Sequence, residues 1–440
     1  MAVDRRTFLA ALAGSALLPA PRAAATGWRA RVATVDITPR RSTWMAGFAA
    51  RTSPSQGVER PLHAKALCLD DGAGSRVVLV TLDLLGLTTG VGARIAEEAR
   101  RRHGLARAQL LLNSSHTHCG PVIDEMLAVA YDMTDAQWRD VRAYTHELEG
   151  KVGRLIGSVL KPGAPVVLRY AEGRAAFAAN RRVQFTPLGP VDHRVPVLRV
   201  DGYRRPLAIV FGYACHNTTL NFQLFSGDYA GHAQAVLEAD LAGVTAIFLT
   251  GCGGDQNPYP RRAPEFAERH GRSLATAVEA SLETVPVKLS DRLRVKYELV
   301  TLDFATPPTR EALMLKVEGP NKVEAAHARR LLEQLKTQGR ITDTYSYPVQ
   351  TVQFGDELLL VALAGEVVVD YSLRLKRELK TPHVWVAGYS NDVFGYVPSR
   401  RVLEEGGYEG GGAMLHTNLP GPFAPSVEER IIDKVLQLAR

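Results

Sequence analysis

The sequence predicts an α/β protein in which a layered mixed sheet is flanked by helices and the site lies at the carboxyl ends of the strands. Two observations support this fold class. Six short, nearly continuous apolar runs are typical of strands that are buried on both faces, and helical patterns alternate with them. The chain has 440 residues, of which 46% are hydrophobic and 22% charged, which is ordinary globular composition.

The predicted strands share one pattern, because each apolar run ends in polar residues. They lie at 76–87, 109–118, 206–216, 244–255, 356–366 and 383–396. The helical patterns lie at 91–104, 134–160, 261–285, 309–338 and 367–379, and a break is expected at Gly319–Pro320. Open α/β sheets hold ligands at strand carboxyl ends, so a site is expected there. The sequence has no internal repeat or clear linker, and 26–440 is interpreted as a single domain.

The first 25 residues differ from the rest of the chain. Arg5 and Arg6 precede Phe8 and Leu9, a short apolar run and the small residues at 23–25. The run is shorter than the roughly 20 residues that span a bilayer, and the segment resembles a twin-arginine signal peptide. We therefore expect export to the periplasm or the medium; the alternative is an ordinary frayed amphipathic N-terminus. No later segment is expected to be transmembrane.

Charge and cysteine content limit the partners. The net charge of +7 comes from 53 basic and 46 acidic residues without a Lys/Arg-rich block, so no nucleic-acid partner is predicted. Mild attraction to anionic surfaces, and hence transient membrane-surface contact, is compatible with this charge. The four cysteines (Cys68, Cys119, Cys215 and Cys252) form no disulfide framework. A Cys215–Cys252 bridge in an oxidising compartment stays open.

Two histidines one residue apart follow the second apolar run. If residues 114–118 stay extended, His116 and His118 point to one side and Thr117 to the other. Two neutral imidazoles that converge in a dry pocket cost free energy unless their lone pairs are engaged. A metal ion would engage them, since histidine is the commonest metal ligand. The alternative is a hydrogen-bonded turn.

Two further strand ends favour the metal. His216 ends one apolar run, and Glu366 ends another in which a solvated carboxylate is not expected. Two histidines and a glutamate form a known catalytic zinc arrangement with one position open for water. The alternative for Glu366 is an N-cap carboxylate of the helix that follows, and both roles are compatible.

These motifs resemble those of the neutral/alkaline, non-lysosomal ceramidases, which are zinc-dependent amidases. "NSSHTHCGP" at 113–121 is similar to their "HTHSGP" signature. In the same order along the mature chain, further segments are similar to family motifs: "VATVDITP" with Met45 and Gly47, "AANRR", "CHNTTLNFQLFSGDYAGHA", "LAGEVVVDYSLRLKREL" and "YSNDVFGYVPSRRVLEEGGYEGG". The segment that resembles the family covers its catalytic N-terminal domain, without its C-terminal immunoglobulin-like domain.

The resemblance implies a zinc ion (Zn²⁺) held by His116, His216, Glu366 and Tyr396. A zinc cation would lower the phenol pKa of Tyr396 from its usual value near 10. Zinc-bound water is the implied nucleophile on an amide carbonyl. The implied catalytic residues are His118, as a proton shuttle or as a partner that supports the metal ligands, and Arg181 and Tyr408, which match positions that contact the reacting carbonyl or the substrate head group.

Two positions depart from the family pattern. Asn257 stands in "GCGGDQNPYP", where the family has a serine that was proposed as a nucleophile, and Cys119 replaces the serine of "HTHSGP". The sequence thus predicts an exported, ceramidase-like zinc amidohydrolase that uses metal-activated water on a small-molecule or lipid N-acyl substrate. The alternatives are a different N-acyl or ester substrate, or a non-catalytic protein that binds zinc or another ligand with the same fold.

Export can be tested through the paired arginines. Replacing Arg5 and Arg6 by lysines should leave unprocessed precursor in the cytoplasm, because the twin-arginine route recognises that pair. Cell fractionation and immunoblotting measure the distribution. Normal export of the double variant would indicate the general secretory route instead.

Overall fold

The computed structural model describes residues 27–440, so the expected signal peptide at 1–25 lies outside the described residues. The fold is mixed α/β, as predicted. Within 27–440, no helix combines the length and apolarity needed to cross a membrane.

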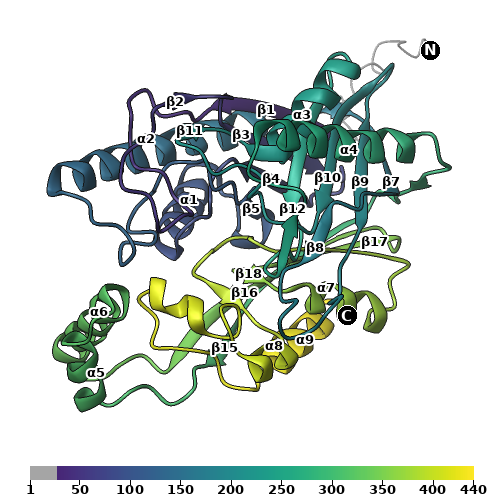
Figure 1. Cartoon of the computed structure of the whole chain (residues 1–440). Coiled ribbons are helices and arrows are strands. Elements are labelled where there is room, and N and C mark those ends of the chain that lie inside the picture. The colour runs from purple at the N-terminus through teal and green to yellow at the C-terminus, as the bar shows by residue number, and fades with distance from the viewer. Residues whose placement is uncertain (1–26) are drawn as a thin grey trace, which may run out of the picture.

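The main elements repeat one order three times: three antiparallel strands, a helix, a fourth strand parallel to the third, and a second helix (Figure 1). The first module contains β1 (Arg29–Asp36), β3 (His63–Asp70), β4 (Arg76–Leu82), α1 (Thr89–His103), β5 (Leu110–Ser114) and α2 (Asp135–Val159). The second contains β7 (Val167–Arg174), β9 (Arg194–Asp201), β10 (Pro206–Tyr213), α3 (Asp228–Asp240), β12 (Thr245–Thr250) and α4 (Pro264–Leu282). The third contains β15 (Leu293–Asp303), β16 (Thr344–Phe354), β17 (Leu358–Leu363), α7 (Val369–Glu378), β19 (His383–Ala387) and α9 (Val427–Leu438).

Short strands complete the sheets. β6 (Ala164–Pro165) pairs with β1, and β14 (Val287–Lys288) pairs with β7 at the equivalent edge of the second module. Three two-stranded pairs lie outside the main sheets: β2 (Gly57–Val58) with β11 (Leu224–Phe225), β8 (Ala178–Asn180) with β13 (Gln256–Pro258), and β18 (Glu366–Val367) with β20 (Tyr396–Val397).

One core lies between the inner faces of the three main sheets. Leu79, Val210 and Leu360, each from the third strand of its module, belong to this core. The residues next to them in each strand point outward, because side chains alternate along a strand. These residues pack under α1 and α2 in the first module, α3 and α4 in the second, and α7 and α9 in the third. Both faces of these strands are therefore buried, which explains the continuous apolar runs of the sequence.

The fourth strands of the modules meet at their carboxyl ends. The buried Asn113 amide in β5 donates to the Gly388 carbonyl, which follows β19, over 2.8 Å. The same amide accepts from the Thr250 N–H of β12 over 3.0 Å, and Gly388 N–H donates to the Thr250 carbonyl over 3.1 Å. The loops that follow these strands consequently start from one place.

A helical hairpin is inserted between β15 and β16. α5 (Arg310–Val317) and α6 (Lys322–Gln338) are separated at Gly319–Pro320, as predicted. The Asn321 side chain accepts from the first N–H groups of α6 and caps this helix. α6 also supports η2 (Gly412–His416) and the residues after it, because His327 Nε2 lies 2.7 Å from the Leu419 carbonyl.

All four cysteines are buried free thiols. The Cys215–Cys252 bridge that the sequence left open is not formed in this structure.

Candidate metal centre

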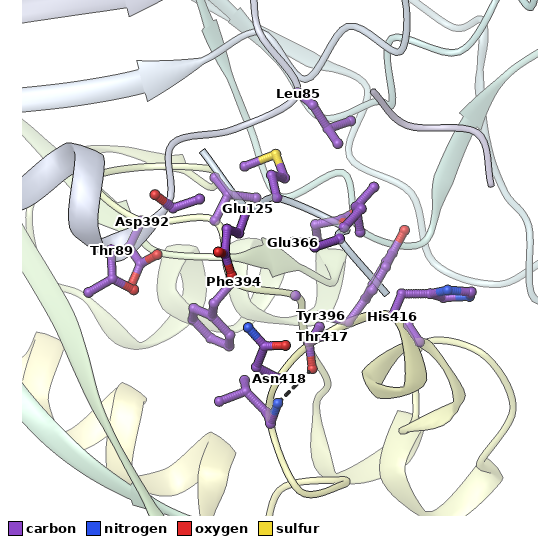
Figure 2. A pocket seen from close by; sticks show the side chains of 18 of the residues that line it. Leu85, Thr89, Glu125, Glu366, Asp392, Phe394, Tyr396, His416, Thr417 and Asn418 are labelled. Atoms are coloured by element: carbon purple, nitrogen blue, oxygen red, sulfur yellow. Dashed lines mark hydrogen bonds between the residues drawn. The ribbon is translucent and has the colours of Figure 1, made fainter. Parts of the chain in front are cut away.

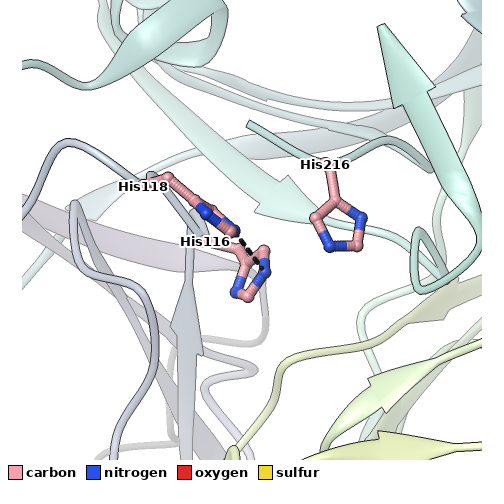
Figure 3. Close-up of side chains that lie close together, drawn as sticks. All are labelled: His116, His118 and His216. Atoms are coloured by element: carbon pink, nitrogen blue, oxygen red, sulfur yellow. Dashed lines mark hydrogen bonds between the residues drawn. The ribbon is translucent and has the colours of Figure 1, made fainter. Parts of the chain in front are cut away.

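His116 lies in the loop after β5, and its backbone is not extended. β5 ends at Ser114, and His116 has φ of 60°, in the left-handed region that non-glycine residues seldom adopt. The condition under which the sequence placed both imidazoles on one side, an extended 114–118, is therefore not met. The two imidazoles nevertheless converge, because His118 Nε2 lies 3.1 Å from His116 Nε2 (Figure 3).

His216 completes a three-histidine cluster from the second module. It follows β10, and one ring nitrogen of each histidine lies within 4.8 Å of those of the other two. His116 and His216 are fully buried, whereas His118 is partly exposed. This cluster could hold a metal ion.

Hydrogen bonds to backbone carbonyls fix the orientation of two rings. His116 Nδ1 lies 2.7 Å from the Leu85 carbonyl, and His216 Nδ1 lies 2.7 Å from the Gly253 carbonyl. Since a carbonyl only accepts, each Nδ1 carries a proton and each neutral ring turns its Nε2 lone pair into the site.

Those two lone pairs face a carboxylate. Glu366 Oε2 lies 3.2 Å from His116 Nε2 and 3.1 Å from His216 Nε2. Lone pairs at this separation repel unless a proton or a cation lies among them. Burial and the Arg181 charge lower the pKa of His216 to about 4, so the His216 ring is neutral at neutral pH. The donor set fits a metal cation.

Glu366 does not cap the following helix. The N-cap of α7 is Val368, which has no side-chain cap, and Glu366 belongs to β18, paired with Tyr396 of β20. The N-cap alternative is thus not realised. The Tyr396 hydroxyl lies 3.2 Å from His216 Nε2, so all four predicted metal ligands meet at one point. Their role as ligands stays a prediction.

Arg181 contacts one of these four predicted ligands, Tyr396. Its Nη2 donates to the Tyr396 hydroxyl over 2.9 Å, and its Nε donates to Glu409 over 2.6 Å. Burial raises the pKa of Tyr396 well above its usual value, and the Arg181 charge opposes this rise. Glu409 also accepts from the buried Arg182 over 2.5 Å. Sequence reasoning missed Glu409, although it directly follows Tyr408 in the "YEGG" motif.

A cavity of about 240 Å³ opens from this centre (Figure 2). One end is lined by His116, His118, Glu366, Tyr396 and Tyr408. The remaining walls come mainly from the loops 125–128 and 392–395 and from 413–419. All three predicted catalytic residues lie at or beside the cavity, since His118 and Tyr408 line it and Arg181 contacts Tyr396. Their catalytic roles stay predictions.

The two positions that depart from the family pattern do not line this cavity. Asn257 is buried in β13, and its Oδ1 lies 3.4 Å from the Thr218 hydroxyl. Cys119 is fully buried, and burial raises the pKa of its thiol. Neither side chain is placed as a nucleophile on a ligand in the cavity.

Two residues of the quoted motifs to which the sequence assigned no role support the histidines. Tyr389 packs its ring 4.5 Å from the His116 ring and follows Gly388, at the meeting point of the strands. Gly47 has φ of +100°, and a Cβ added there would lie 2.5 Å from the His118 ring. Gly47 therefore leaves the space that His118 occupies.

The chain has the fold of solved ceramidases. The crystal structure of neutral ceramidase from Pseudomonas aeruginosa matches with a TM-score of 0.75 and 18% sequence identity, over 94% of this chain and 74% of that chain. A ceramidase complexed with C2 matches with a TM-score of 0.74 and 17% identity, over 94% and 75% of the two chains. No protein-family model and no curated protein matches the sequence.

The space at Gly47 can be tested with a matched pair of variants. Gly47→Ala and Gly74→Ala place a Cβ at similar φ values, +100° and +112°, but only the first Cβ meets another side chain. Left-handed strain should cost each variant about 1–3 kcal/mol of unfolding free energy. Gly47→Ala should lose more, because His118 must move. Urea unfolding at one fixed metal load measures both, and equal losses would contradict the assigned contact.

Proposed function

We propose that this protein is an exported, zinc-dependent hydrolase of the neutral ceramidase family that cleaves an N-acyl amide bond. One observation carries the proposal: the His116 and His216 lone pairs converge on the Glu366 carboxylate at the end of a cavity. The shared fold with solved ceramidases supports the reaction class. The twin-arginine pattern before residue 26 supports export.

Zinc would be held by His116, His216, Glu366 and Tyr396. Nitrogen and oxygen ligands in this number suit zinc, and two histidines with a glutamate are a known catalytic set. When bound, zinc would supply Lewis-acid polarisation of a carbonyl and activation of water.

The neighbouring side chains would handle protons and charge. His118 lines the cavity beside His116, so its imidazole can take a proton from water and return it to the leaving amine. Arg181, held in place by Glu409, and Tyr408 would donate hydrogen bonds to the charge that develops on the carbonyl oxygen. Binding zinc alone requires none of these three groups, which favours catalysis over the non-catalytic alternative.

Water is the proposed nucleophile. Asn257 and Cys119 lie outside the cavity wall, and burial keeps the Cys119 thiol protonated. An ester or another N-acyl substrate would be attacked by the same groups, and this alternative stands beside ceramide.

A lipid substrate is supported by an exposed apolar loop next to the site. Val183, Phe185 and Leu188 are 60%, 40% and 99% exposed in the loop that follows Arg181 and Arg182. The Phe185 ring lies against Gly407, directly before Tyr408 of the cavity. Exposed apolar groups of this kind are typical of contact surfaces, and we propose transient contact with a membrane surface here.

The metal can be tested by elemental analysis. Purified protein should contain about one zinc ion per chain and should lose amidase activity to chelators. His116→Ala should lose the zinc, whereas replacement of the exposed His146 by alanine should retain it. Undiminished zinc in His116→Ala would refute the assignment.

The nucleophile can be tested with two variants. His118→Gln should slow amide hydrolysis roughly 10²–10⁴-fold, as expected for the loss of a proton-transfer group, while zinc stays bound. Asn257→Ser should not accelerate the wild-type reaction. Mass spectrometry of quenched reactions should find no acyl group on the protein; a trapped acyl-enzyme on any side chain would overturn the water mechanism.

A further inference from the structure

His118 is held differently from the other two histidines of the cluster. His116 and His216 each bond a backbone carbonyl through Nδ1, whereas the buried Nδ1 of His118 has no hydrogen-bond partner among residues 27–440. The orientation of the His118 ring therefore depends mainly on packing. Its proposed part in proton transfer depends on that orientation, because distance and angle decide whether Nε2 can take a proton from water.

Two adjacent residues of the loop between β1 and β2 supply this packing. The Phe48 ring centroid lies 4.8 Å from that of His118, and a Cβ added at Gly47 would lie 2.5 Å from the same ring. The Gly47 N–H donates to the Tyr131 hydroxyl over 2.9 Å, which fixes the backbone at one point. Phe48 is only half-buried, so its ring needs a second support.

Arg51 provides the second support. It is 8% exposed, its Nη1 donates to the Ala46 carbonyl, and its guanidinium carbon lies 5.0 Å from the centroid of the Phe48 ring. The Arg51 N–H also donates to the Phe48 carbonyl over 3.2 Å and closes a tight turn. One hydrogen bond and one cation–π contact of the same guanidinium thus hold the residues on both sides of Gly47.

The rest of the Arg51 guanidinium is bound by the second module. Nε donates to Gln223 Oε1 over 2.7 Å, and Nη2 donates to the Phe222 carbonyl over 3.1 Å, just before β11. All three side-chain acceptors of Arg51 are uncharged, so no ion pair with them offsets the cost of burying the guanidinium. Its hydrogen bonds fix the loop that packs on His118 relative to the module that carries His216.

We propose that Phe48 and Arg51 are positioning residues for His118. Phe48 restrains the imidazole directly. Arg51 makes no hydrogen bond to His118 and acts through the loop that carries Phe48. This inference rests on the proposed function, in which His118 transfers the proton. Loss of Arg51 should slow the chemical step and loosen the His118 ring, while zinc stays bound by its own ligands.

Kinetics test the inference through His118. Arg51→Met should lower kcat for amide hydrolysis about tenfold with KM and zinc content unchanged, since a displacement of about 1 Å can cost up to about 10²-fold. In the His118→Gln background the same substitution should have no further effect on kcat, because it acts through that side chain. Equal slowing in both backgrounds, or no slowing in wild type, would overturn the inference.

Arg107→Met is the matched control. Arg107 also stacks on an aromatic ring, that of Tyr297, at 4.1 Å, and it lies just before β5, at the end away from the histidines. Because it is not connected to the loop that packs on His118, its replacement should leave kcat within about twofold of wild type.

Chemical labelling tests the inference without turnover. Diethyl pyrocarbonate modifies accessible neutral imidazoles, and tandem mass spectrometry reports each histidine separately. In zinc-loaded Arg51→Met, His118 should react about tenfold faster than in wild type, because a loosened loop opens more often. The exposed His146 should react at an unchanged rate. If Arg51→Met does not fold, Gln223→Ala removes one acceptor of Arg51 and should act in the same direction. An unchanged His118 rate would overturn the inference.

The two assays separate this inference from the proposed function. Amide hydrolysis by wild type, with His118 labelling that does not respond to Arg51→Met, would refute the positioning role and leave the amidase function standing. Faster labelling of His118 in Arg51→Met, without hydrolysis of any amide by wild type, would refute the amidase function and leave the positioning of the ring standing.

Discussion

The Asn113 side chain provides the constraint on which the site depends. A buried amide is costly unless both its donor and its acceptor are used, and Asn113 uses them to join β5 to β12 and to the residue after β19. The three modules are thereby held in register at one point. Each joined segment contributes to the site a few residues later. His116 follows Asn113 in the first segment. The Gly253 carbonyl, which orients His216, follows Thr250, and Tyr389, which packs on His116, follows Gly388.

Near this point, polar and charged side chains form one connected network of hydrogen bonds and ion pairs. The Glu366 carboxylate faces two imidazoles, and the Tyr396 hydroxyl lies between His216 and Arg181. Arg181 and Arg182 share Glu409, and Arg182 also contacts Glu405 of α8 (Arg400–Glu405). Because Arg181 and Arg182 both pair with carboxylates, the arginine beside the candidate metal site keeps one orientation.

The sequence was informative wherever one local pattern reports burial. Continuous apolar runs predicted the third and fourth strands of each module but not the first two, and polar residues at the ends of these runs identified His116, His216 and Glu366. The threefold module order could not be predicted, because periodicity reports that a strand is buried but not which sheets share its core. The left-handed turn at His116, the space left by Gly47 and the cavity walls depend on contacts between distant segments, for which a single sequence has no signal.

The division of the candidate ligands among the modules gives a bound ion a role in assembly. His116 comes from the first module, His216 from the second, and Glu366 and Tyr396 from the third. No single module carries the set, so a partly folded chain would present at most a fragment of it. An ion at this point stabilises only the docked arrangement of all three modules, and its binding free energy adds to the cooperativity of the whole chain. Chemical competence and complete folding would then be acquired in the same step.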